Sequence, residues 1–137
     1  MSSEAVSSSA VQTGVAQITG IIPQFLVDDL DRAIAYYRDN LGFELAFIYE
    51  SFYASVTRNG FAIHLKEAPK LAAERAHRKE HGLDAYVSVS GVRELFSELQ
   101  ARGANVIKPL ETHPWDCVDF HVEDPDGYIL CFSELTA

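Results

Sequence analysis

Hydrophobic residues in the first half of the chain follow a strand-like pattern, then a helical one, then a strand-like pattern again. An apolar run over residues 18–27 is followed by apolar side chains three and four positions apart over residues 30–41, with Asp29 placed to cap the helix. Three short alternating runs come next, at residues 43–50, 51–57 and 61–67. This order of elements predicts a βαβββ unit.

The same pattern returns after a polar, charged and alanine-rich connector at residues 67–82, which reads as helical. A strand-like run begins at residue 84, and apolar residues recur at helical spacing over residues 92–99. Three further alternating runs follow, at residues 105–110, 116–122 and 128–134. The chain is therefore an internal duplication.

The repeat defines the expected fold and domain boundaries. Residues 1–17 are rich in serine and small residues and are expected to form a flexible leader, whereas residues 18–137 form a single domain. Its two modules, residues 18–66 and 83–135, each carry a small sheet that needs a partner, within the chain or across a dimer. The predicted fold is α+β: two tandem βαβββ modules that form a cup-shaped mixed β-sheet with helices on the outer face.

Alignment of the two halves identifies residues that share the concave side of this cup. The matched pairs are Ile22 and Asp84, Gln24 and Tyr86, and His64 and Cys131. In the last strand of each module, the apolar positions expected to pack under the helices are Phe61, Ile63 and Leu65, matched by Tyr128, Leu130 and Phe132. Because side chains alternate along a strand, His64 and Cys131 are expected to point away from that core.

Composition narrows the choice of partner only slightly. The net charge of −9 argues against a nucleic-acid backbone and mildly favours cationic or neutral small ligands. The sequence predicts no membrane span and a cytoplasmic location. Cys117 and Cys131 lack a zinc-ribbon or CxxC spacing, so both are expected to be reduced thiols.

The motifs DLDRAIAYYRDNLGF at residues 29–43, FAIHL at residues 61–65 and PWDCVDFHVEDPDGYILCF at residues 114–132 carry a family resemblance. With YVSVSGVRELFSELQARG between them, they resemble the vicinal oxygen chelate superfamily, which includes glyoxalases, bleomycin-resistance proteins and extradiol dioxygenases. The resemblance spans about residues 18–135 and implies the fold. It leaves function open, because this scaffold hosts both enzymes and drug-sequestering proteins.

Enzymatic members of the superfamily hold a divalent metal with four side chains, and the resemblance places those positions at Ile22, His64, Asp84 and Cys131. Only His64 matches the usual ligand types. Ile22 cannot coordinate a metal, and Cys131 would supply a soft thiolate better suited to zinc than to iron, manganese or magnesium. We therefore expect no metal cofactor, with a three-ligand site at His64, Asp84 and Cys131 as the alternative.

Metal-free members resemble the bleomycin-resistance proteins, which bind a bulky drug in a cleft between protomers. The stretch PWDCVDF is similar to their W-G-x-R-x-F motif at Trp115 and Phe120, whereas Asp116 and Val118 depart from it. Trp115 is a candidate wall of a ligand pocket or, equally, a packing residue. A homodimer is expected on the same resemblance.

The turn DPDG at residues 124–127 predicts how the last hairpin pairs. Pairing Val122 with Tyr128 would place Asp119 opposite Cys131 and His121 opposite Ile129. The candidate ligand-binding residues are Gln24, His64, Tyr86, Trp115, Asp119, His121 and Cys131. Ser88 shares the same face by parity.

Three functional hypotheses follow. The first is a dimeric protein that binds a small aromatic or cationic molecule in the cup without chemistry. The second is a metal-dependent lyase, isomerase or dioxygenase with an irregular site at His64, Asp84 and Cys131. The third is an interaction module with a closed cup.

Overall fold

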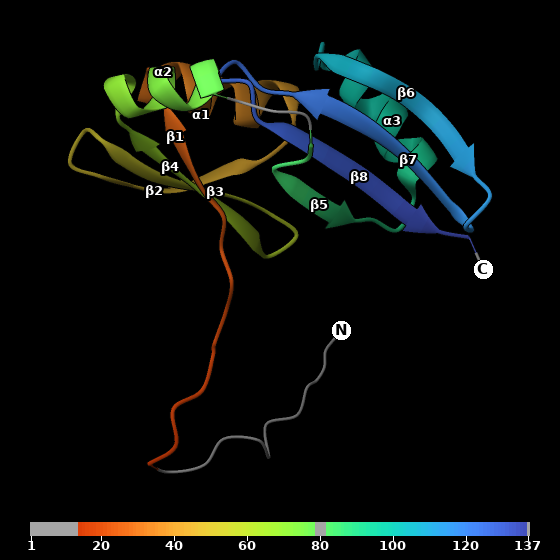
Figure 1. The fold of residues 1–137 in the computed structure, drawn as a ribbon, viewed down its shortest axis with the longest axis horizontal. Helices are drawn as coiled ribbons and strands as arrows, with labels where there is room; N and C mark the ends of the chain where they lie inside the picture. Colours follow the sequence, from red (N-terminus) through yellow and green to blue (C-terminus); the bar gives the residue numbers. More distant parts are fainter. Residues whose placement is uncertain (1–13, 79–81, 137) are drawn as a thin grey trace.

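The computed structural model describes residues 14–78 and 82–136 and contains two βαβββ modules side by side (Figure 1). The elements of the first module are β1 (Gln24–Val27), α1 (Leu30–Ala35), a short π-helical turn η3 (Tyr36–Asn40), β2 (Glu44–Tyr49), β3 (Tyr53–Arg58) and β4 (Phe61–Glu67). Those of the second are β5 (Ala85–Ser88), α3 (Val92–Ala101), β6 (Val106–His113), β7 (Cys117–Glu123) and β8 (Ile129–Leu135). The helix α2 (Pro69–Arg78) connects them, as the composition of the connector predicts.

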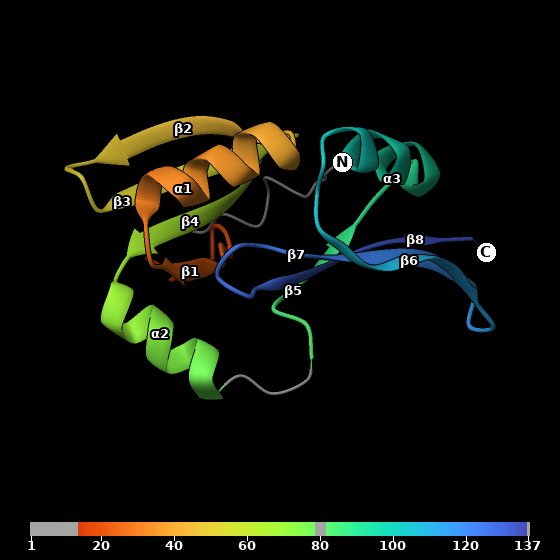
Figure 2. The same ribbon diagram turned by 90° about the horizontal axis from the view of Figure 1, so that it is seen from above.

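Each module builds its own four-stranded sheet, in the orders β1-β4-β3-β2 and β5-β8-β7-β6. In both sheets the first and last strands of the module pair in parallel, and the other neighbours are antiparallel. The predicted α+β fold of two tandem βαβββ modules is confirmed. Figure 2 shows the modules from above, with α2 beside β1.

Helices cover one face of each sheet. The helix α1 packs on β3 and β4, whereas α3 packs on β6, β7 and β8. Local capping starts α1 where the sequence predicts, because the side chain of Asp29 accepts a hydrogen bond from the backbone N–H of Arg32 at 3.0 Å. Among residues 14–78 and 82–136, the opposite face of each sheet carries no helix of its own module, and the candidate site residues that belong to strands lie there.

The two modules share one hydrophobic core. It includes Tyr37 and Leu65 from the first module and Phe120 and Leu130 from the second, all fully buried. Phe61 was expected in this set, but that expectation is wrong, since its side chain is 79% exposed. Phe61 is the first residue of β4, directly after the turn at Asn59 and Gly60, whereas Ile63 and Leu65 further along the strand are buried.

The turn before β8 joins the modules. The ring of Tyr128 stacks on Phe25 with centroids 4.0 Å apart, and its hydroxyl accepts a hydrogen bond from the backbone N–H of Leu26 at 2.7 Å. The hydroxyl of Tyr37 donates to the buried carboxylate of Asp124 at 2.7 Å. These contacts pair the two modules within one chain.

The expected strand over residues 18–27 is shorter than its pattern suggests, because β1 begins at Gln24. Residues 14–23 extend away from both modules in Figure 1, and the side chains of Ile18 and Ile21 are exposed. Pro23 has no backbone N–H, so it cannot donate a hydrogen bond that would continue the pairing with β4. Its carbonyl still accepts one hydrogen bond, from the backbone N–H of His64 at 2.9 Å. Of the expected leader, residues 1–13 lie outside the described residues.

Candidate functional site

On the open face of the first sheet, a row of cross-strand partners runs from Gln24 through His64 and Ser55 to Phe47. The hydroxyl of Tyr53 lies 2.9 Å from Nδ1 of His64 and accepts a hydrogen bond from Nε2 of Gln24 at 2.9 Å. The hydroxyl can donate its proton to Nδ1 or accept the proton of Nδ1, depending on the tautomer of the imidazole. His64 is thus held by a polar network of this sheet.

Aromatic side chains surround that network. Successive rings meet edge to face, with centroids 5.3 to 6.5 Å apart, in a chain made of Phe47, His64, Tyr53, Phe52 and Tyr49. We call these five residues the aromatic wall. The side chains of Phe47 and Tyr49 are 47% and 61% exposed, so the wall presents ring surface to solvent. Such a surface suits a planar or cationic organic ligand.

Sequence reasoning found His64 but missed the other four members of the wall. A signal was present, because aromatic residues recur at positions 47, 49, 52 and 53, in and beside the turn between β2 and β3. The alternation along β2 was read only as evidence for a strand.

On the open face of the second sheet, Tyr86, Cys131 and His121 form one row, and Ser133 and Asp119 belong to the next. Tyr86 pairs with Cys131 as Gln24 pairs with His64, so two of the equivalences drawn from the repeat, Gln24 with Tyr86 and His64 with Cys131, are confirmed. This face brings together three of the predicted site residues, Asp119, His121 and Cys131, whose ligand atoms all lie within 4.8 Å of one another.

The predicted register of the last hairpin is wrong by two residues. Val122 pairs with Leu130, which puts His121 opposite Cys131 and Asp119 opposite Ser133. The turn is longer than DPDG alone because the backbone N–H of Asp124 bonds the carbonyl of Tyr128 at 2.9 Å. A register shift of two residues keeps each side chain on the same face of the sheet. Asp119, His121 and Cys131 therefore still share one face, as predicted.

Burial shifts the pKa values of two side chains on this face, Cys131 and His121. It raises the pKa of the Cys131 thiol to about 12, with the nearby Asp119 carboxylate adding to the effect. Burial also lowers the pKa of His121. At neutral pH the Cys131 thiol is therefore protonated and is a poor nucleophile.

The four family metal positions do not fit a metal site in this chain. Asp84 is held by Arg75 at 2.8 Å and accepts a hydrogen bond from the N–H of Ile129 at 2.8 Å, while Ile22 offers no ligand atom. Among residues 14–78 and 82–136, the groups of convergent ligand atoms include neither His64 nor Asp84. The alternative set of His64, Asp84 and Cys131 is therefore not assembled within these parts of one chain.

Trp115 belongs neither to the aromatic wall nor to the group of Asp119, His121 and Cys131; it lies in the β6–β7 turn. Its ring is 67% exposed and stacks on His113 with centroids 4.5 Å apart and planes 8° from parallel. The imidazole of His113 in turn lies 2.9 Å from the carboxylate of Asp119.

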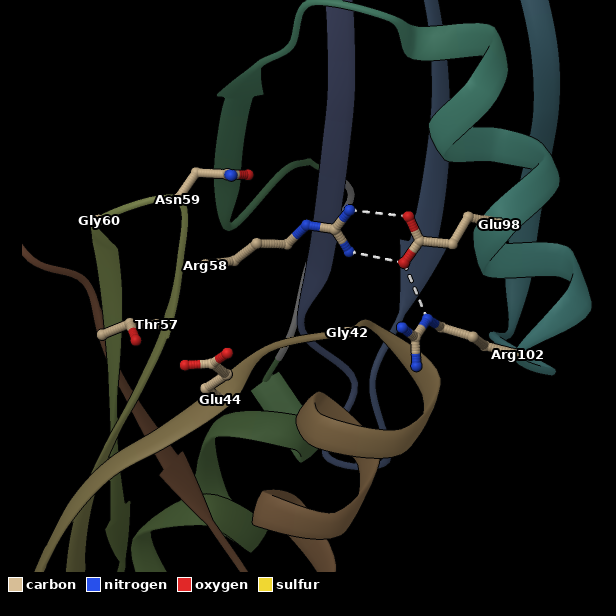
Figure 3. Close-up of a pocket in the computed structure, with 8 residues that line it drawn as sticks. All are labelled: Gly42, Glu44, Thr57, Arg58, Asn59, Gly60, Glu98 and Arg102. Atoms are coloured by element: carbon tan, nitrogen blue, oxygen red, sulfur yellow. Dashed lines mark hydrogen bonds and ion pairs between the residues drawn. The ribbon is translucent and has the colours of Figure 1, made fainter.

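A polar hollow of about 470 Å³ lies between the modules, away from the predicted residues (Figure 3). Arg58 bonds both oxygens of Glu98, at 2.8 and 2.9 Å, and Arg102 bonds one of them at 2.8 Å. The hydrogen bond from Arg58 is the main cause that lowers the pKa of Glu98 to about 2. Gly42, with a φ of 74°, lets the guanidinium of Arg58 approach the backbone there, where a Cβ would clash. The charges of Arg58, Glu98 and Arg102 are paired with one another, so we interpret the hollow as a contact region between the modules.

Comparison with known proteins places this fold in a family. Residues 15–132 match the model of the Glyoxalase/Bleomycin resistance protein/Dioxygenase superfamily. A bleomycin resistance protein of Geobacillus stearothermophilus is 29% identical over 128 residues, which cover 82% of this chain and 94% of that protein. A bleomycin resistance protein of Staphylococcus aureus matches to the same extent.

Two solved structures are similar in fold. The bleomycin-binding protein of Streptomyces verticillus, complexed with copper(II)-bleomycin, has a TM-score of 0.67 at 21% identity, covering 86% of this chain and 97% of that one. TioX from Micromonospora has a TM-score of 0.67 at 23% identity, covering 85% and 98%. Within residues 14–78 and 82–136, no helix has the length and apolar character needed to cross a membrane. The chain belongs to the Glyoxalase/Bleomycin resistance protein/Dioxygenase superfamily.

Proposed function

We propose that this protein is a cytoplasmic homodimer that binds a small aromatic or cationic molecule on the open faces of its sheets. It does so without a metal at the four family positions and without changing the ligand. The observation that carries this proposal is the exposed aromatic wall, in a chain whose family metal positions do not converge.

The aromatic wall supports binding because of its chemistry. Rings such as Phe47 and Tyr49 offer large contact area at low cost in conformational entropy, and their faces attract cations. The imidazole of His64 and the amide of Gln24 supply polar groups beside them. A mostly apolar surface with a few placed polar groups is typical of small-molecule sites. The net charge of −9 adds a weak preference for cations.

Exposed apolar surface supports the homodimer. All residues of β2 are exposed, and so are Ile18, Ile21 and Ile22 in the segment before β1. Large apolar patches on one protomer are typical of a protein interface. A second copy would cover them and turn each open face into one wall of a cleft.

The relatives narrow the ligand class. Two are named for bleomycin resistance, and the Streptomyces verticillus protein is a bleomycin-binding protein. Asp116 and Val118 depart from the motif of that group, so the proposal concerns bulky aromatic or cationic compounds as a class.

Calorimetric titration with copper(II)-bleomycin and a set of planar aromatic cations tests this. We expect at least one compound to bind, and the double variant Phe47→Ala with Tyr49→Ala to weaken it by at least about tenfold, the equivalent of about 1.4 kcal/mol. Phe61→Ala is the matched control, because Phe61 is an exposed aromatic residue outside the wall.

Three results would contradict the proposal. The first is a monomer in sedimentation experiments that binds none of the compounds. The second is binding that only Phe61→Ala weakens. The third is a stoichiometric metal, in protein purified without chelators, that His64→Ala removes; it would favour the metal-dependent lyase, isomerase or dioxygenase instead.

A further inference from the structure

Three side chains with metal-binding atoms converge on the β6–β7 hairpin. His113, the last residue of β6, pairs directly with Cys117, the first residue of β7, and Asp119 follows two positions later on the same face. Nε2 of His113 lies 2.9 Å from a carboxylate oxygen of Asp119. The ligand atoms of all three residues lie within 4.8 Å of one another.

From this geometry we propose that His113, Cys117 and Asp119 form a binding site for a zinc-class transition-metal ion. None of the three is one of the four family metal positions, and the site does not depend on the proposed small-molecule function. A thiolate, an imidazole and a carboxylate are ligands that zinc accepts, and three protein ligands leave a fourth position open. The thiolate disfavours magnesium and calcium, which prefer oxygen.

The spacing of the three atoms suits that ion. Ligand atoms in a tetrahedral zinc site lie roughly 3.3 to 3.8 Å apart, given zinc–ligand distances of about 2.0 to 2.3 Å. Because the atoms of the hairpin already lie within 4.8 Å of one another, small rotations of the side chains would bring them to one point. Cys117 is buried, and the side chains of His113 and Asp119 are 14% and 16% exposed, so the site is shielded from water.

A second observation, the buried hydroxyl of Ser133, indicates that a hydrogen-bonding group is missing near Asp119 among the described residues. Ser133 pairs with Asp119 across β7 and β8, so the two side chains lie on the same face. Ser133 is 97% buried, and within the described residues its hydroxyl has no hydrogen-bond partner. An unsatisfied buried hydroxyl is unfavourable, and a water on the open metal position would satisfy it.

Trp115 supports the site and offers a way to observe it. Its ring stacks on His113, which fixes the plane of the imidazole. It is the only tryptophan of the chain, so its fluorescence reports directly on His113.

Asp119 also belongs to the second convergent group, with His121 and Cys131. The hairpin set is favoured because the imidazole of His113 and the carboxylate of Asp119 are already in contact, and because its three ligands come from one seven-residue segment. On binding, the Cys117 thiol would lose its proton to solvent, and the metal would replace any proton between His113 and Asp119.

Titration of chelator-treated protein with Co²⁺ tests the proposal. We expect a thiolate-to-cobalt charge-transfer band, visible bands of a tetrahedral ion and a change in Trp115 fluorescence, with loss of the two cobalt absorption features when Zn²⁺ is added. Cys117→Ala should abolish the charge-transfer band, whereas the matched variant Cys131→Ala, which also removes a buried cysteine, should keep it. His113→Ala should weaken Co²⁺ binding at least tenfold and abolish the fluorescence change.

Circular dichroism of each variant would show whether it is folded, and Cys117→Ser serves where Cys117→Ala does not fold. The proposal is overturned if the parent protein shows no charge-transfer band. It is equally overturned if the band is lost in Cys131→Ala, with or without loss in the Cys117 variants, since Cys131 would then be a ligand.

Discussion

The open faces of the two sheets are built on the same backbone but carry different chemistry. The first has an exposed aromatic wall around His64, whose imidazole is satisfied by Tyr53. The second has a thiol, an imidazole and a carboxylate, at Cys131, His121 and Asp119, and the buried hydroxyl of Ser133, which has no hydrogen-bond partner in the described part of the chain. The strand order and the parallel pair of first and last strands are the same in both.

This difference shows that the repeat sets where a side chain points and leaves open what it does there. His64 and Cys131 occupy equivalent positions, yet the imidazole contacts exposed aromatic rings, whereas the thiol is almost completely buried. The first face therefore exposes aromatic surface, whereas the second gathers polar side chains. Each prediction below examines what the two sheets share or where they differ.

Loss of the Tyr128 side chain should have the largest effect, because this ring joins the core of both sheets. Tyr128→Ala removes the stack on Phe25, the contact of the Arg75 guanidinium 3.4 Å from the ring centroid and the hydrogen bond to Leu26. We expect the free energy of unfolding to fall by about 3 to 5 kcal/mol, in a single transition, in urea denaturation.

Tyr128→Phe is the control that separates the contribution of ring packing from that of the hydrogen bond. It keeps the ring and should lower the free energy of unfolding by about 1 to 2 kcal/mol, because the N–H of Leu26 loses its partner. Two separate transitions, with only one of them shifted, would show that the sheets do not share one cooperative core.

The second prediction concerns pH, through Asp124 at the junction of the modules. Burial raises its pKa to about 6 from an ordinary 3.8. Between about pH 4 and pH 6 the folded protein therefore keeps a proton that the unfolded chain has lost. The free energy of unfolding should fall as pH rises through this range, by roughly 2 to 3 kcal/mol from this group.

Asp124→Asn should remove that contribution, since its amide oxygen can still accept the hydrogen bonds from the N–H groups of Asp126 and Tyr128. Urea denaturation at several pH values measures the difference between parent and variant. Glu98, whose pKa is lowered from 4.5 to about 2, makes the free energy of unfolding rise with pH up to about pH 5, but it is present in both proteins and cancels in their difference. A difference that stays constant from pH 4 to pH 7 would disprove the role of Asp124.

The smallest effect comes from the equivalent residues of the two open faces. Cys131→Ala leaves a small cavity at a position that is 1% exposed, and we expect a loss of about 1 to 2 kcal/mol in the free energy of unfolding. His64→Ala should cost less than about 1 kcal/mol, because His64 is only half-buried and the Tyr53 hydroxyl keeps its bond with Gln24. A larger loss for His64→Ala than for Cys131→Ala in urea denaturation would contradict the expectation that Cys131 contributes more to stability than His64.

Much of the fold was predictable because it depends on local periodicity. The alternation of apolar residues identified most strands, and the repeat placed Gln24 beside His64 and Tyr86 beside Cys131. The segment at residues 18–23 was read as a strand because its pattern is apolar. A strand also needs a partner for its backbone, and Pro23 interrupts that pairing.

The two modules, their order of elements and the face of each candidate residue within a strand could be inferred from the sequence, because they follow from side-chain period along helices and strands. Which side chains meet depends on the three-dimensional fold. The aromatic wall, the pairing of Asp84 with Arg75 and the convergence of His113, Cys117 and Asp119 depend on hairpin register and packing between segments. A turn one or two residues longer changes those contacts without changing the local pattern, as the β7–β8 hairpin shows.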